Sequence, residues 1–356
     1  MPYQRPDTAP GHRHRTVVGV HRRSASAWLA FLVLVAACGS DPGPDSGATP
    51  EPVGGEPTGT IAVEEPAASA ATPSPPCPDP PCYGEPERVG QLSTDVITGV
   101  SGMSASHRAP DRYYVVSDLA GTSEVIVIEE DGTPVAHLEI EGMAARNAEA
   151  LAVGPCGEEA SDTCLFIGDI GDHVGRDHVV VYRLPEPDLD DPPDGPLAAD
   201  ELRYTYPDSP TDAEALLVDP TGRPLIISKA SFDDENGETG PTHLYRGGPD
   251  GGVMEHLGEI ALPDPENPTF APLVGNVVTG ADAVDGMVLL RTYDEVLEYR
   301  AGDPDAALAD FPDWPVQRVP SPFQIQSETV AYRLDGCGYL TTAEMSGSID
   351  AVGCVD

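Results

Sequence analysis

The sequence predicts an all-β protein, and three observations lead to this fold class. Short strings of β-branched and aromatic residues recur along the chain, such as Tyr113–Val116 and Val125–Ile128. Turn signals such as Asp131-Gly132 and Asp285-Gly286 separate these strings, because glycine accepts the positive φ of tight hairpins. After residue 82 there is no capped amphipathic stretch with the period of a helix. We therefore expect strands and hairpins throughout that region.

The first 37 residues predict an export signal peptide. Several arginines precede an apolar run from Ala27 to Ala37, which is too short for the roughly 20 residues that span a bilayer. Val35-Ala36-Ala37 and the following Cys38 resemble the lipobox of bacterial lipoproteins. This resemblance implies lipidation at Cys38 and a membrane-anchored protein that faces the extracellular or cell-wall side. The alternative is a signal peptide cut elsewhere, with Cys38 left as a free thiol.

Residues 38–82 have a different composition from the rest of the chain. They are mainly Pro, Gly, Ala, Ser, Thr, Asp and Glu, with hardly a large apolar side chain. Such a segment cannot bury a core, so the composition predicts a disordered tether between the lipid anchor and the folded part. Residues 83–356 are then expected to form one folded domain.

The cysteines fit an oxidising compartment. The chain has seven of them, and lipidation of Cys38 leaves an even number for disulfides. Six cysteines allow 15 connectivities, so pairing between sequence neighbours is a hypothesis. It gives the pairs Cys77–Cys82, Cys156–Cys164 and Cys337–Cys354.

The charge balance excludes one class of partner. The chain carries 60 acidic and 19 basic residues, and its net charge is -41. Such a chain repels phosphate backbones, so we expect no nucleic acid partner. Divalent cations are natural counter-ions, although an acidic surface also serves solubility alone.

Five segments of the folded region share one pattern. Each has a polar entry, a strand of small and apolar residues, a turn and a second apolar strand; they begin at Thr98, Asn147, Asp212, Thr279 and Gln326. Two more strand candidates separate the repeats, for example within Val179–Leu184 and Leu202–Tyr206. Four strands per repeat predict a β-propeller of five or six blades. The last repeat lacks an outer strand, and Arg88–Thr94 is expected to supply it and close the ring.

The first strands of three repeats carry a family resemblance. Asn147–Val153, Asp212–Asp219 and Gln326–Tyr332 resemble the inner strands of bacterial propellers of the phytase-like and WD-repeat-like kind. The resemblance covers most of Ile97–Asp356 and implies the propeller fold. Its motifs are shared by propellers of unlike function, so it implies no particular activity.

Acidic residues on these strands form the predicted functional site. Glu149, Glu214 and Glu328 have like positions in three repeats, and Asp282 is expected on the same side in a fourth. Carboxylates about 6 Å apart repel by roughly 3 kcal/mol per pair at an effective dielectric near 20, so the ring must hold protons or a cation. Calcium is the predicted ion because it takes oxygen ligands without histidine or thiolate. The alternatives are bonds to backbone amides of a neighbouring blade, or an open hydrated channel.

Charges also end several second strands: Asp118, Asp169, Lys229 and Arg291. Lys229 is the only lysine in the chain, and together with Arg291 it would suit an anionic ligand such as a phosphate ester. Salt bridges between blades are the other interpretation. Asp169 and Asp172 in a glycine-rich turn predict Asx turns, with a second calcium as the alternative.

We predict a cell-surface lipoprotein whose propeller is a binding or scaffolding module, with calcium at its axis. Its partners would be the membrane, through the lipid anchor only, and an unknown protein or small anionic ligand. The alternative is a calcium-dependent hydrolase of phytase-like or lactonase-like type, with the four carboxylates on the metal and Lys229 and Arg291 on the substrate. A purely structural envelope protein is a third hypothesis. No nucleophile elbow or zinc motif supports catalysis.

Overall fold

The computed structural model describes residues 81–355, except 173–174, 231, 234–237, 267–275, 304 and 335. The predicted signal peptide, Cys38, Cys77 and the tether up to residue 80 lie outside the described residues. Within the described part, no helix is long and apolar enough to cross a membrane.

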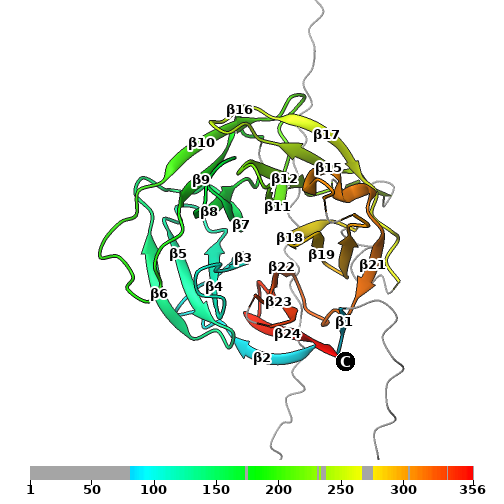
Figure 1. The fold of residues 1–356 in the computed structure, drawn as a ribbon, viewed down its shortest axis with the longest axis horizontal. Helices are drawn as coiled ribbons and strands as arrows, with labels where there is room; N and C mark the ends of the chain where they lie inside the picture. The colour runs from blue at the N-terminus through cyan, green and yellow to red at the C-terminus, as the bar shows by residue number, and fades with distance from the viewer. Residues whose placement is uncertain are drawn as a thin grey trace, which may run out of the picture. The chain divides into compact units, whose positions relative to one another are not determined.

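The described residues form five small, mainly antiparallel sheets arranged in a ring, and one separate two-stranded hairpin (Figure 1). Each of the five sheets in the ring is one blade, so the predicted all-β propeller is confirmed, with five blades. Blade 1 contains β3 (Val100–Ala105), β4 (Arg112–Ser117), β5 (Glu124–Glu129) and β6 (Pro134–Glu139). Blade 2 contains β7 (Ala148–Pro155), β8 (Thr163–Asp169), β9 (Val179–Pro185) and β10 (Asp200–Thr205), and the short β16 (Gly252–Val253) extends its edge.

The other three blades follow in chain order. Blade 3 contains β11 (Ala213–Val218), β12 (Pro224–Ser228), β15 (Thr242–Arg246) and β17 (Glu255–Ile260), with β13 (Phe232–Asp233) and β14 (Glu238–Thr239) as a separate hairpin. Blade 4 contains β18 (Val278–Val284), β19 (Met287–Thr292), β20 (Val296–Arg300) and β21 (Val316–Val319), with the 3-10 helix η1 (Leu308–Asp313) before β21. Blade 5 contains β22 (Ser327–Tyr332), β23 (Gly338–Ala343) and β24 (Ser348–Val355).

The N-terminal part of the described chain completes blade 5. Strand β2 (Glu87–Gln91) pairs antiparallel with β24, and so does β1 (Cys82–Tyr83). The predicted closure of the ring between the two ends of the chain is therefore confirmed. Strand β1 was not predicted, and it begins at Cys82, the last residue that composition assigned to the tether.

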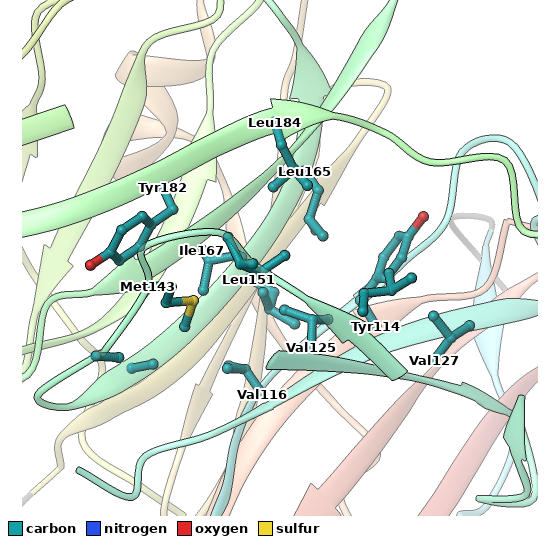
Figure 2. Packing of buried hydrophobic residues seen from close by; sticks show 14 of the residues in the cluster. Tyr114, Val116, Val125, Val127, Met143, Leu151, Leu165, Ile167, Tyr182 and Leu184 are labelled. Atoms are coloured by element: carbon teal, nitrogen blue, oxygen red, sulfur yellow. The ribbon is translucent and has the colours of Figure 1, made fainter. Parts of the chain in front are cut away.

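Five apolar cores hold the blades together, one at each interface between neighbours. Figure 2 shows the core between blades 1 and 2, to which blade 1 contributes Tyr114 and Val125 and blade 2 contributes Leu151 and Ile167. These side chains alternate along strands that are buried on both faces, which accounts for the near-continuous apolar strings in the sequence.

The inner strands β3, β7, β11, β18 and β22 surround the axis (Figure 1). They approach one another closely, and this explains the small residues in them. A Cβ atom on Gly102 would lie 2.8 Å from the backbone of Ala150, and one on Gly280 would lie 2.7 Å from the Glu328 carbonyl oxygen. Only glycine fits at these two positions.

Two of the three predicted disulfides are present. The disulfide Cys156–Cys164 connects the residue after β7 to the start of β8, with Cα atoms 4.9 Å apart. The disulfide Cys337–Cys354 connects the residue before β23 to the end of β24. Pairing of Cys82 with Cys77 stays a prediction, because Cys77 lies outside the described residues.

Candidate functional site

Each inner strand has one register irregularity, and it falls at the same place in every blade. The pairing with the second strand skips a single residue there. A bulge of this kind leaves one residue outside the ladder and re-aims its side chain. The five residues concerned are Ser101, Glu149, Glu214, Thr279 and Glu328, which we call the axial cluster.

All five residues of the axial cluster are buried. The Ser101 hydroxyl donates to the Glu149 carboxylate of the next blade. The Thr279 hydroxyl donates to the Ser327 carbonyl oxygen at 2.7 Å, which links blades 4 and 5. The two hydroxyl members therefore join neighbouring blades, while the three acidic members remain to be neutralised.

The three glutamates lie close enough to affect each other's protonation. Burial raises the pKa of Glu328 well above its ordinary value, and repulsion from Glu214 and Glu149 adds to this. Burial followed by repulsion from Glu214 also raises the pKa of Glu149. The pKa of Glu214 is raised to about 7, again mainly by burial. The structure thus brings together three of the four carboxylates predicted from the sequence, and each of them is harder to ionise than a glutamate in water.

Lys229 is the cation beside these carboxylates. Its ammonium forms an ion pair with Glu214 and donates to the Tyr293 hydroxyl at 3.2 Å. Its pKa is lowered by burial, but attraction to Glu214 and further neighbours outweighs this, so the net direction is upward. One ammonium faces three buried carboxylates. The second oxygen of Glu214, Oε2, is buried and has no hydrogen-bond partner among the described residues.

The residues after the second strands form a second ring around the axial cluster. Register places Lys229 at the position of Asp118, Ile170, Tyr293 and Glu344 in the other blades. Repulsion from Asp118, after burial, raises the pKa of Glu344. Asp169 and Arg291 do not belong to this ring. The predicted match of these two residues with Asp118 and Lys229 was wrong, because Asp169 pairs with Ala148 and Arg291 pairs with Gly280, and each therefore precedes the ring position of its blade.

Asp282 lies apart from the three glutamates in the ladder. Thr279, three residues earlier, has the bulge position in blade 4. The Asp282 carboxylate accepts hydrogen bonds from the backbone N–H groups of Tyr332 at 2.7 Å and Ala283 at 2.9 Å. Tyr332 is in the neighbouring blade, so this bond matches the alternative of backbone contacts between blades. Burial raises the pKa of Asp282 to about 7.

Arg291 is completely buried, and its guanidinium donates to the Ser321 hydroxyl. Nε and Nη2 of this side chain have no hydrogen-bond partner among the described residues. Burial lowers the pKa of Arg291 to about 10. The side chain therefore presents no exposed charge, in contrast to the pocket residue expected beside Lys229.

The glycine-rich turn after β8 is held by protein contacts. Asp169 accepts N–H groups from Arg146 and Asn147 and forms a buried ion pair with Arg176, Nη1 to Oδ1 at 2.7 Å. The carboxylate of Asp172 accepts the Arg176 backbone N–H at 2.7 Å. Asp169 is thus engaged by protein groups.

Carboxylates are the ligand type that calcium prefers. No group of three or more His, Cys, Asp or Glu side chains within the described ranges is arranged to hold a metal ion. The oxygens of Glu149 and Glu214 are partly taken by Ser101 and Lys229. Calcium at the axis therefore stays a prediction.

No protein-family model and no curated protein matches this chain. Among solved structures, the chain is similar to the PQQ-bound aldose sugar dehydrogenase from Streptomyces coelicolor, with 10% identity over 77% of this chain and 99% of that chain and a TM-score of 0.42. It is also similar to virginiamycin B lyase from Staphylococcus aureus, with 9% identity over 76% and 99% and a TM-score of 0.37. A putative gluconolactonase has 15% identity over 76% and 92% and a TM-score of 0.36. Likenesses this remote carry no inference about ligand or reaction, and the five described sheets define the class of protein, a five-bladed β-propeller.

Proposed function

We propose that this chain is a cell-surface lipoprotein whose propeller is a binding module, and that the axial cluster receives a cationic group of its ligand. The observation that supports binding is the charge of the cluster. Glu149, Glu214 and Glu328 are all buried, and their pKa values are all raised. Such a site holds protons when empty and exchanges them for a cation.

The cluster is poorly suited to a purely structural role. Buried carboxylates that serve only stability are normally paired or bonded by several N–H groups. Among the three glutamates, only Glu214 forms an ion pair with Lys229 in the described part of the propeller. A cation that enters would be attracted by all three carboxylates. Its positive charge would take the place of the protons that the carboxylates release.

The alternative of calcium-dependent hydrolysis needs both Lys229 and Arg291 on the substrate. The Lys229 ammonium is engaged by Glu214 and Tyr293, and the Arg291 side chain is buried beneath the surface. No positive pair is therefore exposed to an anionic substrate in the described residues. We accordingly propose binding as the function and calcium as the first inorganic cation to test.

The test is calorimetric titration of the purified protein with calcium chloride at pH 6 and pH 8, in buffers of different ionisation enthalpy. We expect saturable binding accompanied by proton release, since the glutamates must lose protons to bind a cation. The Glu149→Gln plus Glu214→Gln double variant should lose both signals. A matched control, Glu158→Gln plus Glu159→Gln, changes two exposed glutamates of a loop and should behave like the parent.

Two results would count against the proposal. Binding that is equal in the parent and in the double variant would place the ion elsewhere on the acidic surface. Absence of binding to calcium and to methylammonium, with a double variant at least as stable as the parent, would leave the cluster without a ligand role.

A further inference from the structure

A pocket lies between blades 1 and 2, beside the axial cluster. It has a volume of about 360 Å³ and is formed by the β4–β5 loop, the segment before β7 and the turn after β8. We call it the interblade pocket and define it by Ala120, Ala144, Ala145, Arg146, Asn147 and Asp172. Its size is at the lower end of the roughly 300–1,000 Å³ that is usual for small-molecule sites.

Two buried acceptors line this pocket without a hydrogen-bond partner. Asn147 is 8% exposed and Asp172 is 7% exposed, and the Oδ1 atom of each has no partner among the described residues. Buried polar atoms are nearly always paired, so two such oxygens in one pocket indicate a missing donor. Both atoms accept hydrogen bonds only, and the missing group must therefore carry N–H or O–H groups.

The pocket lining contains one acidic residue, Asp172, and two basic residues, Arg146 and Arg176. Neither arginine forms an ion pair with Asp172 among the described residues, so its carboxylate favours a cation as the missing donor. Asp172 has no ion-pair partner in the described part of the chain, because the adjacent Arg176 is committed to Asp169, Nη1 to Oδ1 at 2.7 Å. The other Asp172 oxygen already accepts the Arg176 backbone N–H. Arg146 is exposed to water at the rim, where its charge is screened.

The remaining wall favours an organic cation. Ala120, Ala144 and Ala145 contribute methyl groups, which suit a hydrocarbon chain and provide no ligand to a metal ion. Calcium takes six to eight oxygens, more than these two side chains supply. An alkylammonium matches both the polar and the apolar part of the pocket. Its three N–H groups can donate to the two acceptors, and its carbon atoms can pack against the alanines.

We propose that the interblade pocket binds the ammonium end of a small alkylamine, held by Asn147 Oδ1 and the Asp172 carboxylate. The ligand is a primary amine in its protonated form, whose hydrocarbon portion lies against the three alanines. This site adjoins the axial cluster, but neither of its two acceptors belongs to that cluster, and the proposal does not depend on that cluster binding a cation.

The test uses butylammonium chloride as the probe, with the purified protein in phosphate buffer. Ligand-observed NMR titration should give saturable binding with a Kd on the order of millimolar, which is expected for so small a ligand. The neutral isostere 1-butanol should bind at least about tenfold more weakly, because it lacks the charge-assisted hydrogen bonds.

Variants then locate the site. Asp172→Asn keeps an acceptor for the Arg176 N–H but turns the other oxygen into a donor, so butylammonium binding should weaken at least about tenfold. Asp177→Asn removes the same charge from an exposed residue of the same loop and should leave the Kd within about twofold. Ala120→Phe fills the pocket from an exposed loop position and should abolish binding while leaving both acceptors intact.

Several results would overturn this assignment. Absence of saturable binding by the parent would mean that the pocket holds water only. An equal loss of butylammonium affinity in Asp172→Asn and Asp177→Asn would show a general effect of surface charge. Loss in Glu214→Gln without loss in Asp172→Asn would place the amine at the axial cluster instead. If Asp172→Asn does not fold, as judged by near-ultraviolet circular dichroism, Ala120→Phe decides alone, and full binding by that variant refutes the pocket.

Discussion

Replacement of Glu214 with glutamine should change how the stability of the propeller depends on pH. Burial raises the pKa of Glu214 from its ordinary 4.5 to about 7 in the folded protein. The folded state therefore binds a proton at pH values where the unfolded chain has lost it, and stability falls as pH rises. Glu214 therefore makes no contribution to the free energy of unfolding below about pH 4.5. Its contribution becomes increasingly unfavourable between pH 4.5 and 7 and is fully unfavourable above that range.

The magnitude follows from the two pKa values. Each pKa unit corresponds to about 1.36 kcal/mol, so ionisation of Glu214 in the folded protein costs roughly 3 kcal/mol. Glu149 and Glu328 act in the same direction, because their pKa values are raised as well. We expect the free energy of unfolding of the parent to be at least about 3 kcal/mol lower at pH 8 than at pH 5.

The assay is urea denaturation at pH 5, 6, 7 and 8, followed by the fluorescence of the buried Trp314 with the disulfides intact. Glu214→Gln should remove the part of the decrease that comes from Glu214, and it should also lower the pKa of Glu149 and Glu328 by removing a repelling charge. Glu158→Gln, in an exposed loop, is the control and should retain the parental slope. A parent whose stability is flat or rises between pH 5 and 8 would refute the reasoning, as would a Glu214→Gln variant with an unchanged slope.

Two further predictions concern the anchor and the fold. Cys38→Ser should move the protein from the membrane fraction to the soluble fraction and remove the mass of a diacylglycerol; an unchanged distribution would refute lipidation there. Gly102→Val should lower the free energy of unfolding by about 1–3 kcal/mol, because its Cβ would lie 2.8 Å from the backbone of Ala150. Gly157→Val, where a Cβ meets nothing within 4 Å, is the matched control in the same urea assay.

The blade pattern was predictable because each blade is buried on both sides. Strings such as Val125–Ile128 and Val179–Tyr182 need apolar residues for two interblade cores, and that requirement is visible in the sequence. Ring closure was also predictable, since blade 5 had only three strands of its own. Strand β1 was not, because two residues that pair at an edge leave no periodic signal.

The axial cluster was predictable only in part. The sequence comparison aligned Thr279-Gly280 with Thr98-Gly99, whereas the ladder aligns it with Ser101-Gly102. The error placed Asp282 near the glutamates and left Ser101 and Thr279 out. Strands of small residues can be shifted against one another by one or two positions without a visible change in their apolar pattern, so only the ladder fixes the alignment of the repeats. The small residue that follows each bulge, as in Gly102 and Gly280, was the available signal.

The position of the charges on this fold favours a ligand over a structural role. Five apolar cores between the blades stabilise the ring, and none of them includes a charged side chain of the axis. At the bulge positions of Ser101 and Thr279, the side-chain hydroxyl donates a hydrogen bond to an acceptor in the next blade. Glutamate at the same position buries a carboxylate that is costly to ionise there. A residue that weakens the fold at three of five equivalent positions, where a hydroxyl would suffice, is most simply explained by a ligand that these carboxylates bind.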